Sequence, residues 1–212
     1  MRRFKNKDDM LRVVVNCALL YEKNLAYKTV LFVTDSKENT ADFEALFMPQ
    51  NFKHLTGVAE TNINPVVFYN RAIGGKLSAR DITFDARGFA AMKLDVLQRL
   101  MNIHMTARMV GDFDGLSERI VADKFAGTTV SAMGFNHVNN YYVPVTSLKE
   151  NVNNVTKKAS RSRVIAIFTK NKDAAIYRDI TYKAHNVSFK QLQEIEPLCK
   201  VIDFEGIMSS NS

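Results

Sequence analysis

Residues 162–184, SRVIAIFTKNKDAAIYRDITYKA, carry the clearest fold signal in the chain. Two runs rich in β-branched and aromatic residues, SRVIAIFTK (162–170) and AIYRDITYKA (175–184), lie on either side of the turn-like sequence Asn171-Lys172-Asp173. Runs of this composition favour strands, and a turn this short joins strands that run antiparallel. The stretch therefore predicts an antiparallel strand pair.

The same strand period continues upstream as far as Met105. The candidate strands are TARMVGDF (106–113), ERIVADKF (118–125), TTVSAMGF (128–135) and NYYVPV (140–145). Turn-like residues separate them, namely Gly115, Gly127 and Asn139-Asn140. Because no helical pattern lies between most of these runs, we predict an antiparallel meander rather than βαβ units.

Helical patterns dominate the first half of the chain. One apolar stripe with spacings of three and four residues runs from Leu11 to Leu25, and a second runs from Phe89 to Ile103. Between them, Asn64-Pro65 is a helix start signal and Gly74-Gly75 is a stop signal. The fold class predicted is therefore α+β, with N-terminal helices followed by an antiparallel sheet.

Three further segments complete the prediction. YKTVLFVTD (27–35) is typical of a strand, and SFKQLQEIEPL (188–198) is typical of a short capped helix. ADFEALFMPQNFKHLTGV (41–58) suits either a short helix or a strand, and Pro49 interrupts both. For this segment we expect extended structure that ends at Thr56-Gly57.

The positive charge is concentrated in one part of the sequence. The net charge is +7, and residues 119–190 contain twelve Lys and Arg against four Asp and Glu, so the whole excess lies in that segment. A one-sided positive field attracts polyanions through counterion release at phosphates. The alternative reading is a solvated surface that keeps the protein soluble.

Several chemistries have no support in the sequence. Cys17 and Cys199 form no CxxC pair. The sequence GGK at 74–76 does not match a phosphate-binding loop, because Asn70 replaces the first glycine of that motif and Leu77 replaces its hydroxyl residue. The histidines are spaced too widely for a local zinc motif; they are His54, His104, His137 and His185. We therefore expect no metal and no cofactor.

The N-terminal apolar run is too short to cross a bilayer, and no signal-peptide cleavage pattern follows it. We expect a cytoplasmic protein without membrane contact.

The sequence is compatible with metal-independent chemistry on a polyanion. Cleavage of RNA by its own 2′-hydroxyl needs only a base, an acid and cations around the phosphate.

An ordered set of motifs resembles a known family. The motifs are NFKHLTGV, FYNRAIGGKLSARDI, ADKFAGTTVSAMGF, YYVPVTSLK, RVIAIFTK and YRDITY, spread from about Phe43 to about Lys183. In order and spacing they resemble the fourth group of phage-associated nucleases of the barnase, EndoU, colicin and RelE (BECR) fold. The resemblance implies N-terminal helices, a four-stranded antiparallel sheet that cleaves RNA without metal, and an origin in a phage or mobile element.

Set against this resemblance, the chain divides into three parts. We expect an N-terminal helix and strand extension at 1–40, a BECR-like nuclease domain at 41–204 and a disordered tail at 205–212. The resemblance also implies RNA as the partner, together with a cognate immunity or host protein. The alternative function is a non-catalytic RNA- or protein-binding module on the same fold.

Three residues are the catalytic candidates. His54 is a titratable ring ahead of a turn, although a histidine beside Phe52 and Leu55 is also typical of packing. Lys76 follows the Gly-Gly stop, where a cation can reach a phosphate or stabilise a helix C-terminus. Lys170 ends a strand and lies close to Tyr177 across a turn, where the two could bind a phosphate and stack a base or form an ordinary hairpin end.

The substrate-binding candidates surround these three in sequence. Thr56 could orient the imidazole of His54 or close the turn. The polar segment NNVTKKASRSR (153–163) is a basic loop suited to phosphate contacts, although many such loops are only solvated. The full set of substrate-binding candidates is Thr56, Lys124, Ser131, Lys158, Arg161, Arg163 and Tyr177.

Overall fold

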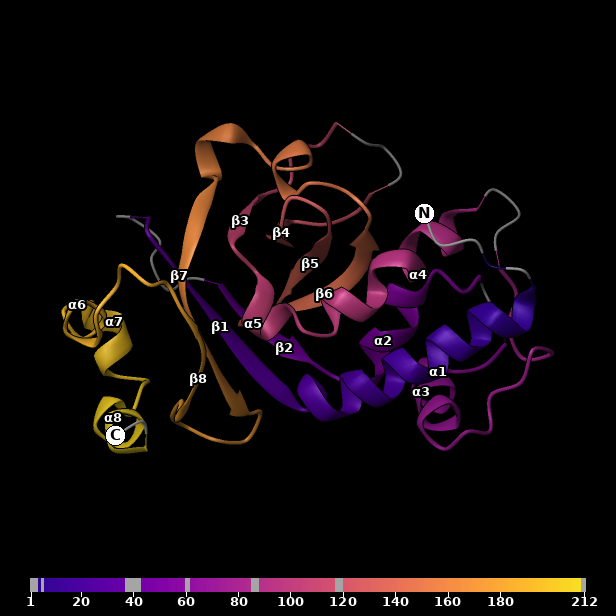
Figure 1. The fold of residues 1–212 in the computed structure, drawn as a ribbon, viewed down its shortest axis with the longest axis horizontal. Helices are drawn as coiled ribbons and strands as arrows, with labels where there is room; N and C mark the ends of the chain where they lie inside the picture. The colour runs from indigo at the N-terminus through magenta and orange to yellow at the C-terminus, as the bar shows by residue number, and fades with distance from the viewer. Residues whose placement is uncertain are drawn as a thin grey trace.

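A computed structural model describes residues 4, 6–36, 43–59, 62–84, 88–116 and 120–210 (Figure 1). Helices dominate the first half of the chain, strands the second, and short helices follow at the C-terminal end. The helices are α1 Lys7–Asn24, α2 Pro49–Thr56, α3 Pro65–Ile73, α4 Phe89–Leu100, α5 Ile103–Thr106, α6 Phe189–Gln193, α7 Glu196–Cys199 and α8 Phe204–Ser210, with 3₁₀ turns η1 Val152–Asn154 and η2 Lys158–Ser160. The predicted α+β class is confirmed.

The strands form one sheet that closes on itself. They are β1 Lys28–Thr34, β2 Phe43–Phe47, β3 Met109–Asp112, β4 Lys124–Gly127, β5 Ala132–Val138, β6 Tyr141–Leu148, β7 Ser162–Asn171 and β8 Asp179–Lys183. Their order is β1-β2-β6-β5-β4-β3-β7-β8, and β1 also pairs with β7. The first seven strands of this order therefore form a ring, and β8 pairs with β7 outside it.

The predicted meander is confirmed, since β3, β4, β5 and β6 are consecutive antiparallel neighbours. Among the described strands, the pairing of β2 with β6 is parallel and the others are antiparallel. Residues 118 and 119 of the expected strand 118–125 lie outside the described residues, and β4 begins at Lys124.

The main core lies inside the ring and continues between the sheet and α1 to α4. Phe43 packs edge-on against Phe135 at 5.1 Å between ring centroids, and Phe32 lies 4.9 Å from Phe43. Tyr21 of α1 meets Phe52 of α2 at 5.3 Å. Burial of these rings stabilises the packing of the strands on one another and on the helices, because each ring removes a large apolar area from water.

A second core covers the outer face of the sheet. Leu31 of β1 and Phe168 of β7 point away from the ring and pack with Leu192, Leu198 and Ile207 from the C-terminal helices. Figure 1 shows α6 to α8 on the far side of β7 and β8 from α1 to α4. The sheet is therefore covered on both faces along β7.

The expected extended structure at the end of segment 41–58 is wrong. Residues 43–47 form β2, but α2 begins at Pro49, the position at which a helix tolerates proline. The Asn51 side chain accepts a hydrogen bond of 2.9 Å from the backbone N–H of Met48, and Gly57 ends the helix with a φ of 71°. Pro49 is thus a helix start, not an interruption.

The expected tail and extension also differ from the structure. Residues 205–210 belong to α8, where Ile207 is buried, so a disordered tail from 205 is wrong for the described residues. At the other end, β1 pairs with β7 from Lys28 to Thr34, and α1 contributes Val14 and Tyr21 to the main core. Residues of the expected extension are thus part of the same sheet and core.

Among the helices of the described ranges, none is long and apolar enough to cross a membrane.

Candidate functional site

Lys124 lies at one rim of the closed sheet, paired with Asp112. The two residues are partners in the β3–β4 register, and the Lys124 ammonium lies 3.2 Å from Asp112 Oδ1. Val110 and Ala126, two positions away on these strands, belong to the main core, so strand alternation turns Lys124 and Asp112 toward the ring interior. The ammonium also lies 5.5 Å from the ring centroid of Tyr142, within cation–π range.

His137 and Tyr142 complete this rim. They are register partners in the β5–β6 hairpin, with ring centroids 5.0 Å apart. The backbone N–H of His137 donates a 2.7 Å hydrogen bond to Asp123, the residue before Lys124. The His137 side chain is exposed, and its ring nitrogens have no hydrogen-bond partner in the described part of the chain. We name Asp112, Asp123, Lys124, His137 and Tyr142 the rim cluster.

The rim cluster holds the groups that acid–base chemistry on an anion requires. An imidazole can act as a general base or a general acid. A phenol can donate a proton, and the ammonium of Lys124 can stabilise negative charge on a phosphate or on the phenol oxygen. Asp112 holds Lys124 in place, because a 3.2 Å ion pair restricts the otherwise flexible lysine side chain.

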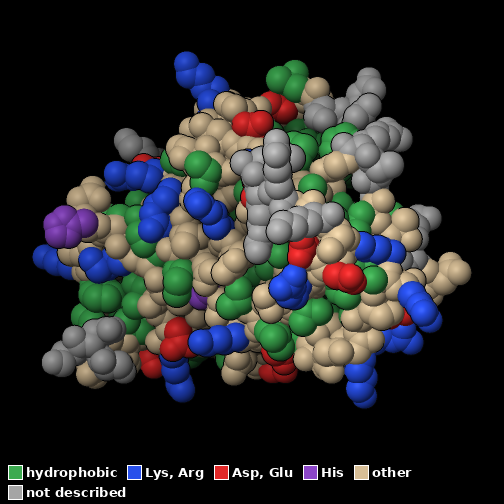
Figure 2. Space-filling view, turned by 45° about the vertical axis from the view of Figure 1, so that its right-hand side comes forward, with side chains coloured by type: hydrophobic (Ala, Val, Ile, Leu, Met, Phe, Trp, Pro, Cys, Tyr) green, Lys and Arg blue, Asp and Glu red, His purple; other side chains and the backbone are tan. Residues whose placement is uncertain are grey.

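The basic loop predicted at 153–163 is attached to the rim cluster through the backbone of Asp112. The N–H of Asp112 donates to Ser160 Oγ at 2.9 Å, and the N–H of Lys157 donates to the carbonyl of Asp112 at 2.9 Å. Lys158 is exposed on this loop. Figure 2 shows several Lys and Arg side chains close together on the left of one face of the molecule, with others spread along its right and lower edges.

The two arginines of the loop have different environments. Arg161 is bonded to the loop itself: its Nε donates to the carbonyl of Thr156 at 3.2 Å, and its Nη2 donates to the same oxygen. Arg163 is exposed and lies 3.5 Å from a carboxylate oxygen of Asp35. Arg161 therefore holds the loop in shape, whereas Arg163 presents its guanidinium at the surface beside one acid.

The three catalytic candidates from the sequence lie on separate elements, and no described contact joins them. His54 is exposed on α2, where its carbonyl accepts a 3.2 Å hydrogen bond from Lys93. Partial burial, followed by the charges of Lys53 and Lys93, lowers the pKa of His54. Lys76 is exposed in the loop after α3. Lys170 lies at the end of β7.

Lys170 and Tyr177 meet as the sequence suggested, but as part of a closed cluster. The ammonium lies 4.5 Å from the Tyr177 ring centroid and 3.6 Å from Glu44 Oε1. Tyr177 is only 1% exposed and donates its hydroxyl to Glu44 at 2.5 Å. Burial, followed by this bond, raises the pKa of Tyr177. The expectation that Tyr177 stacks a base does not fit this geometry, since its ring is covered.

The remaining substrate-binding candidates are Thr56 and Ser131. Thr56 is buried, and its hydroxyl donates to the carbonyl of Lys53 at 2.7 Å, so it belongs to the end of α2 and does not orient the His54 ring. Ser131 lines a cavity between the β4–β5 turn and the α4–α5 junction. Arg99 shares that cavity and was not recognised from the sequence.

Sequence reasoning also missed His137, Tyr142 and Asp112. One signal could have linked two of them: the Asn139-Asn140 turn pairs Val138 with Tyr141, and one step outward pairs His137 with Tyr142. Asp112 gave no such signal, because its neighbour Lys124 lies beyond a loop that includes residues 117–119, outside the described residues.

In the described ranges, no group of three or more His, Cys, Asp or Glu side chains is arranged to hold a metal ion.

A protein-family model described as phage-Barnase-EndoU-ColicinE5/D-RelE like nuclease4 matches residues 13–186. The match begins within α1 and includes every strand. No curated protein and no solved structure matches the chain.

Proposed function

Because the chain belongs to the family of phage-Barnase-EndoU-ColicinE5/D-RelE like nucleases, group 4, we propose that it is a metal-independent endoribonuclease whose reaction takes place at the rim cluster. The observation that carries the proposal is the meeting of an exposed imidazole, a phenol and an ammonium at one rim of the sheet. A basic loop attached to the same rim supplies the attraction for a polyanion.

The proposed reaction needs two proton transfers and no external nucleophile. A base removes the proton of the 2′-hydroxyl, and the 2′-oxygen attacks the adjacent phosphorus. The bond from phosphorus to the 5′-oxygen breaks, and an acid protonates that oxygen. The products are a 2′,3′-cyclic phosphate and a free 5′-hydroxyl. DNA lacks the 2′-hydroxyl, so the same site cannot cleave it by this route.

In this proposal His137 is the base and Tyr142 the acid. The ring nitrogens of His137 are free to accept a proton, and the ring faces Tyr142. Lys124 stabilises the charge that develops on the phosphate, and it also stabilises the phenolate left when Tyr142 has released its proton. In the reverse reaction His137 acts as the acid and Tyr142 as the base.

His54 is the alternative base. Partial burial and then the charges of Lys53 and Lys93 disfavour its protonated form, so its pKa is lowered and it is a weaker proton acceptor. Its exposed ring lies on α2, and no described contact joins it to Lys158 of the basic loop or to Arg163 of β7. The proposal therefore assigns no catalytic part to His54, Lys76 or Lys170.

The family description also supports a setting. The description names phage nucleases. We propose a phage or mobile element as the source, the cytoplasm as the location, RNA as the substrate and a cognate immunity or host protein as a further partner. The basic loop is the surface that such an inhibitor would cover if it excludes RNA.

Incubation of the purified protein with tRNA and total RNA in EDTA tests the proposal. We expect cleavage by the wild type, a rate lower by about 100-fold or more in His137→Ala, and an unchanged rate in the exposed control His185→Ala. Loss of activity in His54→Ala with retention in His137→Ala would move the site to α2. Salt-sensitive RNA binding without cleavage, at several pH values, would favour the non-catalytic module instead.

A further inference from the structure

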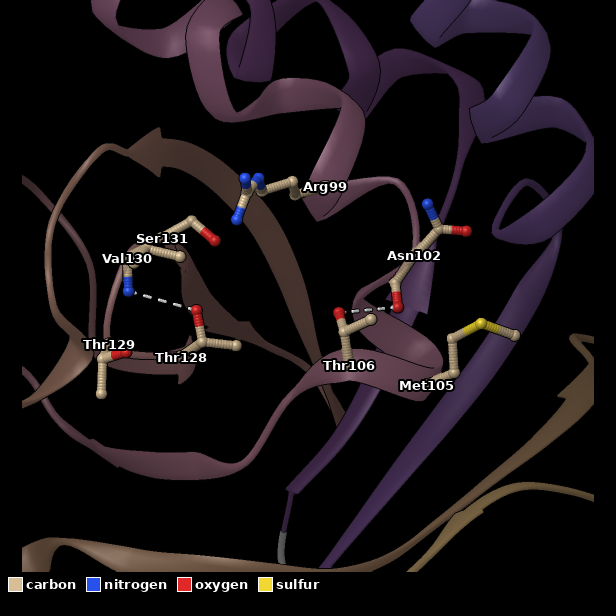
Figure 3. A pocket seen from close by; sticks show the side chains of 8 residues that line it. All are labelled: Arg99, Asn102, Met105, Thr106, Thr128, Thr129, Val130 and Ser131. Atoms are coloured by element: carbon tan, nitrogen blue, oxygen red, sulfur yellow. Dashed lines mark hydrogen bonds between the residues drawn. The ribbon is translucent and has the colours of Figure 1, made fainter. Parts of the chain in front are cut away.

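A second candidate site lies at the other ends of β4 and β5. There the turn Thr128–Ser131 and the α4–α5 junction border a cavity of about 440 Å³ (Figure 3). Its lining residues are Arg99, Asn102, Met105, Thr106, Thr128, Thr129, Val130 and Ser131. The volume is within the range of pockets that bind small ligands.

Hydrogen-bond donors converge on this cavity from both walls. Arg99 comes from the last turn of α4, and Figure 3 shows its guanidinium pointing toward the turn that carries Ser131. In the described residues the Arg99 guanidinium has no acid partner, and the hydroxyls of Thr129 and Ser131 have no hydrogen-bond partner. The cavity thus offers several donors that nothing in the described chain satisfies.

Other polar groups of the lining are already used. Thr128 Oγ1 accepts a 3.2 Å hydrogen bond from the N–H of Val130, which shapes the turn. Thr106 donates to the carbonyl of Asn102 at 2.9 Å. The Asn102 side chain donates to the carbonyl of Gln98 at 3.2 Å and accepts from Asn24 at 3.0 Å. These bonds hold the walls in place, and the polar side chains of the lining without a described partner are Arg99, Thr129 and Ser131.

The charge of the lining selects an anion. Arg99 is the one charged side chain among the lining residues, and no carboxylate opposes it there. A guanidinium presents paired N–H donors that match two oxygens of a phosphate, and hydroxyls donate to further oxygens. The set is better suited to a phosphate than to a carboxylate, since three separate donor groups can bond different oxygens.

The same cavity has apolar surface for the rest of a ligand. Met105 is 42% exposed and Val130 is 49% exposed, and both side chains border the space. A nucleoside joined to the phosphate could cover them, which would remove apolar area from water.

We propose that the Arg99 cavity binds the phosphate group of a nucleotide, with Arg99, Thr129 and Ser131 as phosphate ligands and Met105 and Val130 against the nucleoside. The nucleotide is either free or part of an RNA strand. The second source rests on the proposed nuclease function, since such a strand would reach from the cavity to the rim cluster at the opposite ends of β4 and β5. The four residues of β4 span roughly 10 Å and the seven residues of β5 roughly 20 Å.

Binding of 5′-AMP, adenosine and inorganic phosphate, measured by calorimetry, tests the proposal without any cleavage step. We expect saturable binding of 5′-AMP and at least about tenfold weaker binding of adenosine. Arg99→Ala should weaken 5′-AMP binding by about tenfold or more, Arg99→Lys should restore part of it, and the exposed control Arg80→Ala should leave it within about twofold. Equal affinity of the wild type and Arg99→Ala, or no saturable 5′-AMP binding, would overturn the proposal.

Cleavage kinetics identify the source of the nucleotide. If an RNA strand occupies the cavity, Arg99→Ala raises KM for RNA with kcat unchanged. If a free nucleotide occupies it, Arg99→Ala loses 5′-AMP binding and keeps the wild-type KM. Absence of RNA cleavage would contradict the proposed function, whereas the calorimetric result would still decide for or against the cavity.

Discussion

At the residue scale, the four histidines have four different environments, and only the structure separates them. His54 is exposed beside two lysines, His137 faces Tyr142 at the rim, His185 is exposed after β8, and His104 is buried. His54 is a candidate from the sequence because it lies beside Phe52 and Leu55 and just ahead of the Thr56-Gly57 turn. The residues around His137 come from other parts of the chain, namely Tyr142 of β6 and Asp123 before β4, so the sequence next to His137 does not reveal them.

His104 makes stability dependent on pH. Its side chain is 6% exposed and its Nδ1 is buried without a hydrogen-bond partner. Burial, followed by the charge of Lys28, lowers the pKa of His104 from 6.5 to about 4. The unfolded chain therefore takes up this proton at a higher pH than the folded chain, and stability falls as the pH drops from about 6.5 to about 4.

Urea unfolding at pH 7 and pH 4.5 measures this effect. We expect the wild type to lose roughly 2 kcal/mol more than His104→Leu between the two pH values. The matched variant His185→Leu, at an exposed position, should behave like the wild type. An equal loss of stability in the wild type and in His104→Leu would contradict this account.

At the element scale, the sequence predicted the strands well and α2 poorly. Runs of β-branched and aromatic residues between turn-like residues mark the strands, and β7, which is buried on both faces, stands out as a nearly continuous apolar run. For α2 the decisive residues are Pro49 and Gly57, and a proline at a helix start looks the same in sequence as a proline between two extended segments. Only the structure of residues 50–57 shows that Pro49 begins a helix.

Gly57 gives α2 its stop and its contact with α4. Its φ of 71° is strained for other residues, and a Cβ there would lie 2.9 Å from Lys93 Cδ and 3.0 Å from Ala90 Cα. We expect Gly57→Ala to destabilise the protein by roughly 2–3 kcal/mol, the sum of backbone strain and a clash with α4 backbone.

The control for this prediction is Gly75→Ala. Gly75 has a similar φ of 66°, but a Cβ there meets nothing within 4 Å, so the variant carries the backbone strain alone, about 1 kcal/mol. Thermal or urea unfolding of both variants gives the difference. Equal destabilisation of the two would show that the clash of the added Cβ with α4 contributes nothing.

At the scale of the whole molecule, ring closure could not be predicted. It depends on the parallel pairing of β2 with β6 and on the pairing of β1 with β7, which join residues about 100 positions or more apart. Strand patterns show that a sheet forms but not which strands meet. For the same reason the sequence indicated a basic segment but not that Asp112 and Ser160 fix its loop to the rim cluster.

The positive charge of the basic loop predicts how RNA binding responds to salt. Lys158 is exposed on the loop beside the rim cluster, and Lys200 is exposed at the end of α7, where it pairs with Glu196. We expect Lys158→Ala to reduce the slope of log K against log salt by about 1, and Lys200→Ala to leave it unchanged. Fluorescence anisotropy with a labelled RNA measures both slopes. An equal reduction in the two variants would show that RNA contacts are spread over the surface.

The central claim is that the rim cluster cleaves RNA through the 2′-hydroxyl. The most direct measurement compares one oligonucleotide as all-RNA and with a single 2′-deoxy substitution at the cleaved position, both in EDTA, with product ends identified by mass. We predict cleavage of the RNA to a 2′,3′-cyclic phosphate and a 5′-hydroxyl, no cleavage at the substituted position, and no cyclic product from His137→Ala. Cleavage at the 2′-deoxy position, or a 5′-phosphate product, would contradict the mechanism.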